Sequence, residues 1–432
     1  MSMFVLSRLF TGSTSQQNPQ SNRNSPVRVV RLRSIHEIDE ELWDSVNDRE
    51  DLFHTHRFIR SVEDAGLENS RFWYLLFYLG DRLVGTAALS SFTVSLDLLV
   101  EGSFRKLIAF LRQWVPHFLR VKILFCGLPV SIGKNALTIS EPSCSEGILE
   151  LLVREIEKIG RQEGIWLLCI KEFLKSETKL VDQVTQHGFF RSCSLPSMRM
   201  KIRWKSFESY LASMRHDYRR PILQSLKKLS LSKPLIQGST VLAEESEKPV
   251  LVLADSSICP PKEFYGLYLN VMERAEVKLE TLNESFFENV CTNLNGEIEL
   301  LAVAKERKLL ATSLLALHRG TMTFLLAGLD YSDRDKYDVY FNLIYGIVSL
   351  AIERGCTSLD LGQTPYWVKQ RIGGEASPVY FYMRAERWYL HRCLKLFHPF
   401  LFPEKRLQTL NVFREQPPAG VNNEDHWSRT RS

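Results

Sequence analysis

The chain has 432 residues, of which 44% are hydrophobic and 24% charged, and its formal net charge is +5. This length predicts two domains or more, because it exceeds what one core usually supports. The composition excludes a disordered chain, and the small net charge gives no indication of a DNA partner. The 8 cysteines show neither a CxxC pair nor zinc spacing, so we expect buried thiols, no metal site and a cytoplasmic location. No apolar run reaches the roughly 18 residues of a membrane-spanning helix.

The two ends of the chain differ in composition from the rest. Residues 1–26 contain no acid and several serines and asparagines. Such a segment is typical of a disordered tail, and an organelle transit peptide is the alternative. Residues 411–432 are predicted to form a second disordered tail.

An internal repeat organises the chain between these tails. Residues 75–89 and 300–317 share a pattern of strand, charged turn and strand, which predicts two similar hairpins. Two copies of one α/β unit in the same order predict tandem related domains, which we place at residues 27–200 and 201–410. An aromatic-rich helix precedes each hairpin, at residues 52–66 in the first copy and 263–276 in the second. A long helix, a glycine and a strand follow each hairpin, at residues 146–170 and 340–361.

The first copy contains an extra segment between its hairpin and its long helix. Residues 103–122 have the pattern of an amphipathic helix, with Leu107, Leu111 and Trp114 on one face and arginines on the other. We expect this helix to pack on its own domain or on a partner subunit, and peripheral attachment to a membrane is the alternative. Residues 386–406 have similar character and favour the alternative slightly.

A basic segment at residues 206–230 connects the two copies. Its cations include Arg215, Arg219 and Arg220, and few acids accompany them. Pro221 is expected to kink or restart the helix, because proline lacks an amide donor and clashes with the preceding turn. The cations form either a solvated face or a site for phosphate or carboxylate, which arginine binds in a bidentate manner.

Polar residues gather after a strand near the end of the second copy. An apolar strand at residues 323–329 leads through an acidic turn into a helix that ends at Gly355, a residue suited to the left-handed conformation of helix ends. Sheets of this type bind ligands at the carboxyl ends of their strands, so the sequence predicts the functional site after the next strand. That strand spans residues 357–361, and beyond it lie Gly362, Gln363, Tyr366 and Lys369.

The order of these segments resembles that of a known family. MRHDYRRPILQSLKKL is followed by an aromatic helix, a hairpin, a long helix and LDLGQTPYWVKQRIGG, which resembles the Fem-like branch of the GNAT N-acyltransferase superfamily, particularly its CelD-type acetyltransferase domain. The resemblance is best over residues 206–384. It implies an α/β fold of mixed sheets with two GNAT-like domains in tandem. It also implies transfer of an acyl or aminoacyl group to an amine of a small molecule or of a cell-envelope precursor.

The resemblance further implies roles for residues of the basic helix and of the last motif. Lys369 would supply positive charge to a phosphate or to the oxyanion of acyl transfer, and Gln363 would donate a hydrogen bond from its amide. Asp360, Tyr366 and the glutamates of the second copy are all candidates for the general base. The predicted catalytic residues are Asp360, Gln363 and Lys369, and the predicted substrate-binding residues are Arg215, Arg219, Arg220, Gly362 and Tyr366.

The turn before the long helix of the second copy bears on the acyl donor. GNAT enzymes typically hold the pyrophosphate of coenzyme A on glycine-rich backbone there, at a helix N-terminus. Residues 328–340 instead contain one glycine and four aspartates, which would repel a phosphate, so acyl-CoA is disfavoured as the donor. Fem-like proteins are similar in lacking this loop, and some use aminoacyl-tRNA, which is the alternative donor. A third hypothesis is a non-catalytic GNAT-like module at the inner face of a membrane.

Overall fold

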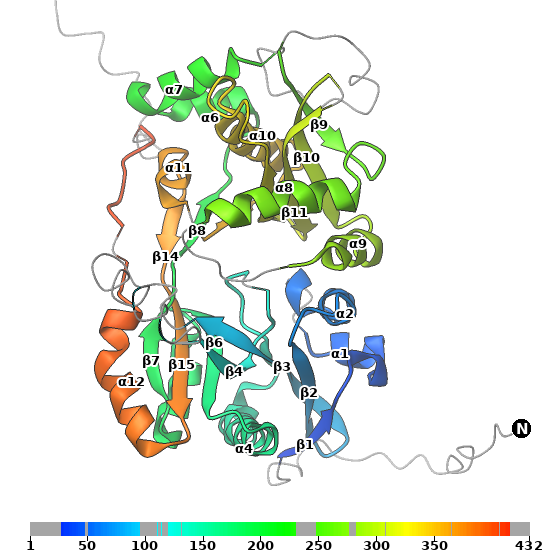
Figure 1. Ribbon diagram of the computed structural model, residues 1–432, viewed down its shortest axis with the longest axis vertical. Coiled ribbons are helices and arrows are strands. Elements are labelled where there is room, and N and C mark those ends of the chain that lie inside the picture. The colour runs from blue at the N-terminus through cyan, green and yellow to red at the C-terminus, as the bar shows by residue number, and fades with distance from the viewer. Residues whose placement is uncertain are drawn as a thin grey trace, which may run out of the picture.

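The computed structural model describes residues 27–47, 51–95, 110, 114, 120–130, 132–229, 248–275, 282–306, 308–363, 365–405 and 407–414. Two mixed β-sheets lie one above the other in the view of Figure 1, and helices pack on both. This arrangement confirms the predicted mixed α/β fold with two units. None of the described helices is long and apolar enough to cross a lipid bilayer.

The first sheet has the strand order β1-β2-β3-β4-β6-β15-β7, and β5 pairs with β3. Its strands are β1 (Val27–Leu32), β2 (Arg71–Leu79), β3 (Arg82–Ser95), β4 (Arg120–Cys126), β5 (Leu137–Ile139), β6 (Leu167–Leu174), β7 (Phe190–Cys193) and β15 (Val379–Ala385). The long helix α4 (Ser145–Glu163) packs its apolar side chains on this sheet and ends at Gly164, whose φ is +66°. The other helices of this unit are η1 (Ile35–Glu37), α1 (Glu40–Asp44), η2 (Leu52–His54), α2 (His56–Asp64), η3 (Pro142–Cys144), α5 (Thr178–Val181), η4 (Asp182–His187) and α12 (Trp388–Leu401).

The second sheet has the strand order β14-β8-β13-β12-β11-β10-β9. Its strands are β8 (Ser197–Lys201), β9 (Val250–Ala254), β10 (Ile298–Lys305), β11 (Lys308–His318), β12 (Thr321–Leu329), β13 (Ser358–Gly362) and β14 (Glu375–Ser377). Its helices are α6 (Phe207–Ser213), α7 (His216–Leu226), α8 (Pro261–Arg274), α9 (Glu284–Asn293), α10 (Val339–Glu353) and α11 (Tyr366–Arg371). α10 is apolar on most sides because it lies between the sheet and the pair α6 and α7. Gly355, at φ +66°, follows its last turn as predicted.

Strands cross between the two units. β8 follows the first unit directly in the chain but pairs with β13 and β14 of the second sheet. β15 comes late in the chain but pairs with β6 and β7 of the first sheet, and α12 packs beside it. The predicted domain boundary at residue 200 stays a prediction. β8, which lies at this boundary, pairs with strands of the second sheet, and β15, which lies far beyond it in the chain, pairs with strands of the first.

The two units also share a hydrophobic core. α2 packs against α9, and Phe58, Phe264 and Phe287 belong to one cluster of buried side chains. Polar contacts border this core, since Arg57 pairs with Glu297 at 2.9 Å. The units therefore form one continuous body.

The basic connector breaks at a different place from the one predicted. Pro221 lies inside α7, and the restart occurs between α6 and α7, at Met214 and Arg215. There Met214 forms a β-bridge with Phe413, and the amide of Arg215 donates to the carbonyl of Val412. The helical conformation is therefore interrupted where residues 412 and 413 contact the chain, and not at the proline.

Two predicted boundaries are also wrong. Residues 120–122 belong to β4 and pair with β3, so the amphipathic helix cannot extend to residue 122. Residues 411–414 contact α6, so the C-terminal tail does not begin at residue 411. The remainder of the amphipathic segment, apart from Phe110 and Trp114, and the tails at 1–26 and 415–432 lie outside the described residues.

Candidate active site

The central parallel strands of the second sheet separate after a short contact. β12 and β13 pair only from Thr321 with Ser358 to Thr323 with Asp360. β12 continues to Leu329, and no described strand pairs with it on that side. A register shift opposite β11 leaves Leu325 as a bulge. As a result, residues 325–327 are only partly buried although they lie in the middle of a sheet.

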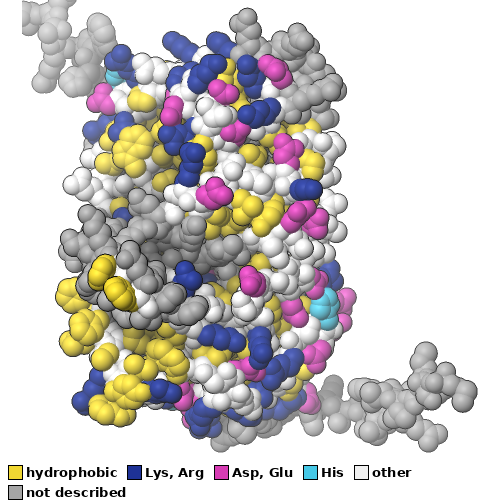
Figure 2. Space-filling model, in the orientation of Figure 1, with side chains coloured by type: hydrophobic (Ala, Val, Ile, Leu, Met, Phe, Trp, Pro, Cys, Tyr) yellow, Lys and Arg dark blue, Asp and Glu magenta, His cyan; other side chains and the backbone are white. Residues whose placement is uncertain are grey.

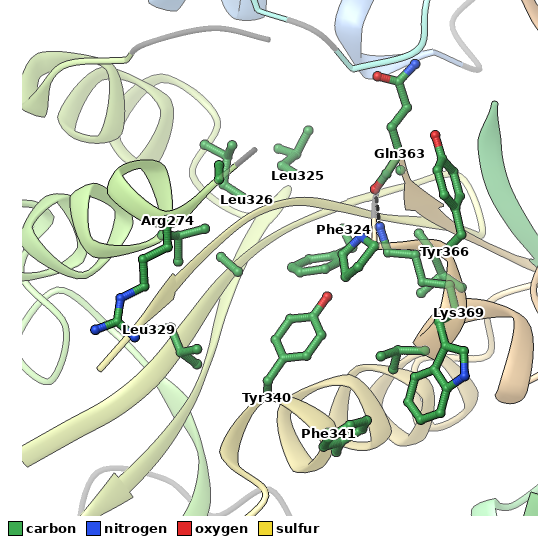
Figure 3. Close-up of a pocket in the computed structure, with 18 of the residues that line it drawn as sticks. Arg274, Phe324, Leu325, Leu326, Leu329, Tyr340, Phe341, Gln363, Tyr366 and Lys369 are labelled. Carbon is green, nitrogen blue, oxygen red and sulfur yellow. Dashed lines mark hydrogen bonds between the residues drawn. The ribbon is translucent and has the colours of Figure 1, made fainter. Parts of the chain in front are cut away.

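The separated strands border a cavity of about 980 Å³. One wall is α8, which lies close to β12 because Gly328 has no Cβ; a Cβ there would come within 2.6 Å of the Cβ of Leu267. The start of α10 and the helix α11 form the opposite wall, as Figure 3 shows. Most lining side chains are aliphatic or aromatic, and Ile132 of the first unit is among them.

Lys369 lies in the wall of this cavity and is the buried cation of the site. Its side chain is only 2% exposed, and its Nζ donates to the backbone carbonyl of Gln363, the bond dashed in Figure 3. Burial lowers the pKa of Lys369 from 10.5 to about 7, and the negative charge of Asp360 opposes this shift. A lysine in this state is able to exchange a proton near neutral pH.

Asp360 holds the end of β13 in place. Its carboxylate pairs with Nε of Arg199 at 3.1 Å and accepts from the hydroxyl of Ser197 at 3.1 Å and from the amide of Gly362 at 2.9 Å. Three donors therefore engage its two oxygens. These contacts suit a residue that shapes the site and tunes Lys369, and its predicted catalytic role stays a prediction.

Gln363 and Tyr366 lie next to Lys369 along the chain. The side-chain amide of Gln363 donates to the carbonyl of Leu195 at 2.7 Å, and Figure 3 shows it pointing away from Lys369. The backbone of Gln363, through its carbonyl, is what contacts the lysine. Tyr366 is buried in the cavity wall, and the ammonium group of Lys405 lies 5.2 Å from the centre of its ring.

Gly362 allows β13 to turn away from β12. Its φ is +66°, a left-handed conformation that favours glycine, and a Cβ would lie 3.4 Å from the carbonyl oxygen of Phe324. The glycine thus allows β13 to pass close to Phe324 of β12 at the point where the two strands separate.

The three arginines of the basic helix do not line the cavity. Arg215 and Arg220 are exposed and Arg219 is half-buried on or beside α7. α7 approaches the site through Tyr218, whose ring centre lies 5.3 Å from the guanidinium carbon of Arg371 in α11. Their predicted role in binding substrate stays a prediction.

Tyr340 is a site residue that the sequence did not single out. It is in the first turn of α10, and Figure 3 shows its hydroxyl pointing into the cavity, toward Phe324 and the side of Lys369. Burial raises the pKa of Tyr340 well above its usual value, so the hydroxyl keeps its proton. Its place directly after the acidic turn was the available signal.

Two acids of the turn before α10 form ion pairs with lysines from other parts of the chain. Asp338 has a left-handed φ of +48°, forms an ion pair with Lys228 at 2.8 Å and accepts from the hydroxyl of Ser225 at 2.9 Å. Asp330 pairs with Lys308 at 2.6 Å. Asp338, at the N-terminus of α10, is therefore held by Ser225 and Lys228 at the end of α7, and its carboxylate would repel a phosphate placed there.

Comparisons with known proteins agree with this geometry. The family described as "Acetyltransferase (GNAT) domain" matches residues 261–370, which include β12, α10, β13 and Lys369. Two curated Mycobacterium tuberculosis proteins, provisionally named 8-amino-7-oxononanoate synthase 2, are each 25% identical over 337 residues, or 76% of this chain. The match covers 41% of those proteins, so the chain spans about two fifths of their length.

Solved structures are similar to this chain at low sequence identity. The crystal structure of FemX has a TM-score of 0.51 and 14% identity, and the match covers 85% of this chain and 99% of that one. A lysylphosphatidylglycerol synthetase C-terminal domain from Agrobacterium fabrum has a TM-score of 0.47 and 12% identity over 85% and 98% of the two chains. A tandem GNAT protein from the clavulanic acid pathway has a TM-score of 0.46 and 11% identity over 84% and 99%.

The family match covers the strands and helices that enclose the cavity, and the similarity to FemX extends over both units. The recognition made from the basic helix and the LDLGQT motif is thereby confirmed. Residues 261–370 of this chain match the GNAT-type acetyltransferase domain, and the fold of the chain is similar to that of FemX.

Proposed function

We propose that this protein transfers an acyl group from a carrier to an amine, in the cavity between β12 and β13. The observation that carries the proposal is the burial of Lys369 in the wall of this cavity, which lowers its pKa to about 7. A large fraction of such a lysine is neutral near physiological pH, whereas an ordinary lysine is almost entirely charged.

In the proposed reaction, Nζ of neutral Lys369 accepts a proton from the ammonium group of the acceptor. The neutral nitrogen attacks the carbonyl carbon of the donor, and the new C–N bond forms. The bond from that carbon to the sulfur or oxygen of the carrier then breaks, and the hydroxyl of Tyr340 gives its proton to the leaving carrier. The nitrogen, which became positively charged on attack, returns a proton to Tyr340, and a neutral amide remains. Lys369, now charged, stabilises the developing oxyanion.

The acyl donor is proposed to bind its phosphates away from the N-terminus of α10. The pairing of Asp338 with Lys228 supports this, because an incoming pyrophosphate would have to displace it. Arg215, Arg219 and Arg220 are the cations that we propose for this role. An acyl thioester is the leading donor, and aminoacyl-tRNA is the second candidate because both α7 and the FemX-like fold suit it.

The acceptor is proposed to be an aliphatic amine. The curated relatives are named for making 8-amino-7-oxononanoate, whose name describes a nine-carbon chain with an amino group beside a ketone. The matched region is only part of those proteins, so such amino ketones are a class to test and not an assignment. Amines of cell-envelope precursors form the second class.

Peripheral contact with a membrane is proposed for α12. Trp388, Leu396 and Phe400 project from this helix and are 70%, 69% and 68% exposed, and Figure 2 shows hydrophobic side chains gathered at this corner. α12 contains no acid, and Arg392 and Lys395 accompany its apolar residues. Exposed aromatic groups with flanking cations fit the interface of an anionic bilayer. Sedimentation with anionic and with neutral vesicles tests this; equal recovery in the supernatant with both would refute it.

The main experiment incubates purified protein with a panel of acyl-CoA thioesters and primary amines and detects acylated amines by mass spectrometry. Lys369→Met is expected to abolish product formation, while Lys201→Met, an exposed lysine of the same sheet, serves as the matched control. Product that appears only with charged tRNA and disappears with ribonuclease favours the second donor. Absence of product with every donor, tRNA included, would refute acyl transfer.

A further inference from the structure

The shape and chemistry of the cavity bear on the size of the group that it holds. Its volume of about 980 Å³ is at the upper end of the roughly 300–1,000 Å³ of pockets that enclose drug-sized molecules. An acetyl group has three heavy atoms and would fill only a small part of this space. The volume therefore leaves room, beside the acceptor amine, for a group much larger than acetyl.

The middle of the cavity is apolar. Leu325, Leu326 and Leu329 of β12 line it together with Val271 and Met272 of α8, and all five are aliphatic or thioether side chains. These leucines come from the stretch where β13 has turned away, so no described strand pairs with them on that side. Apolar surface of this kind favours a hydrocarbon partner, because contact removes both surfaces from water.

Charged groups lie toward the ends of the cavity. Figure 3 shows Lys369 on one side of the view and Arg274 on the other, with the leucines between them. Arg274 is exposed, and its guanidinium stacks 3.9 Å from the centre of the Tyr331 ring. Arg334 and Asp335, which also line the cavity, pair with each other at 2.8 Å. The arrangement suits a chain that reacts at the Lys369 end and extends through the apolar middle.

We infer that the cavity binds a long saturated hydrocarbon chain, so that the group transferred by the proposed reaction is a long-chain acyl group and not acetyl. That this chain is transferred rests on the proposed function. That the cavity binds the chain does not depend on any transfer. Affinity is then expected to increase with chain length until the chain reaches the Arg274 end.

The binding experiment uses a fluorescent fatty acid, dansyl-undecanoate, and displaces it with unlabelled fatty acids of increasing length. Each added methylene is expected to strengthen binding about three- to fourfold up to a chain of about ten to twelve carbons. Equal displacement by acetate and dodecanoate, or displacement by neither, would overturn the inference.

Variants test whether the chain lies along β12. Ala327 lines the cavity and is partly buried, so Ala327→Phe is expected to weaken binding of dodecanoate at least tenfold and to leave butyrate unchanged. Ala212→Phe, on the exposed side of α6, is the matched control. Ala275→Phe, at the C-terminal end of α8, gives a second test should Ala327→Phe fail to fold. Length dependence that is the same in the cavity variants and in the wild type would refute this placement.

The same chain-length series in the transfer assay separates the two proposals. Fast transfer of acetyl with no gain for longer chains would refute the long-chain inference and leave acyl transfer standing. Tight binding of dodecanoate without transfer from any donor would refute the proposed function and leave the hydrocarbon site standing.

Discussion

The two units of this protein contain the same central pair of parallel strands and use it differently. In the first unit, β4 pairs with β6 from Ile123 with Leu167 to Cys126 with Ile170, and β4 ends at that last pair. In the second unit, β12 continues from Phe324 to Leu329 after its last pair with β13. In the second unit, β13 turns away at Gly362 while β12 continues, and the cavity opens beside this part of β12.

Each unit also buries a lysine near this pair of strands. Lys171, in β6, is 7% exposed, and its Nζ lies 3.5 Å from the carboxylate of Glu172. Lys369 is 2% exposed beside an apolar cavity, and the carboxylate that acts on it, Asp360, is engaged by Arg199. The comparison teaches that the two buried lysines differ in their carboxylates: Glu172 lies beside Lys171, whereas Asp360 is shared between Lys369 and Arg199.

The largest expected effect separates the two lysines. Lys369→Met is expected to lower acyl transfer at least 100-fold, because it removes the proton acceptor. It is not expected to lower the free energy of unfolding at neutral pH, because the cost of burying an ionisable lysine disappears with the lysine. Lys171→Met is expected to lower that free energy by about 3 kcal/mol, because Glu172 keeps its charge and loses its contact. Transfer rates and urea unfolding of both variants measure this. The same loss of stability in both would erase the distinction.

Asp360→Asn tests the link between the two charges of the second unit. The variant leaves Arg199 with a weaker partner, and since the arginine is partly exposed we expect a loss of about 2 kcal/mol of unfolding free energy. It also removes the charge that raises the pKa of Lys369, so the pH at which transfer becomes half-maximal should fall. A pH profile identical to that of the wild type would show that Asp360 does not act on the lysine.

The dependence on pH sharpens the role of Lys369. Transfer is expected to increase about tenfold per pH unit below about pH 7 and to level off above it, because the neutral amine is the active form. Stability follows the same pKa: the unfolded chain binds more protons between about 7 and 10.5, so the cost of burying Lys369 is full below about 7 and disappears toward 10.5. Unfolding of the wild type and of Lys369→Met across this range measures the difference, which should narrow as the pH rises.

The smallest expected effect concerns the N-terminus of α10. Asp338→Gly removes an ion pair with Lys228 but relieves a left-handed backbone at φ +48°, so the change in unfolding free energy should be under about 1 kcal/mol. If acyl-CoA is the donor, removing the acid should lower its KM a few-fold, because repulsion of phosphate falls. An increase in KM would mean that Asp338 helps to bind the donor.

Local patterns predicted the elements of the site well. The period of α10, the left-handed Gly355 and the hairpin of β10 and β11 all follow from short stretches of sequence. The exchange of β8 and β15 between the sheets could not be predicted in this way, because pairs such as Tyr382 with Ile170 join residues far apart in the chain. The break at Met214 was missed for the same reason, since Phe413 causes it.

The residues predicted after β13 line the cavity, but their surroundings were not visible in the sequence. Lys369 was predicted at the end of β13, yet only the packing of α11 on the sheet shows that it is buried and that its pKa falls. The amide of Gln363 was expected to face the reaction and instead contacts Leu195 in the segment that precedes β8. Tyr340 became a candidate only when the first turn of α10 was seen beside the cavity.

The most direct test of this account is an NMR titration of Lys369 with lysine labelled at its ε-carbon, assigned by comparison with Lys369→Met. The titration of this one resonance is expected to have its midpoint at about pH 7. A midpoint near the ordinary lysine value of about 10.4 would contradict the account, because a lysine charged at neutral pH cannot accept a proton from the acceptor amine.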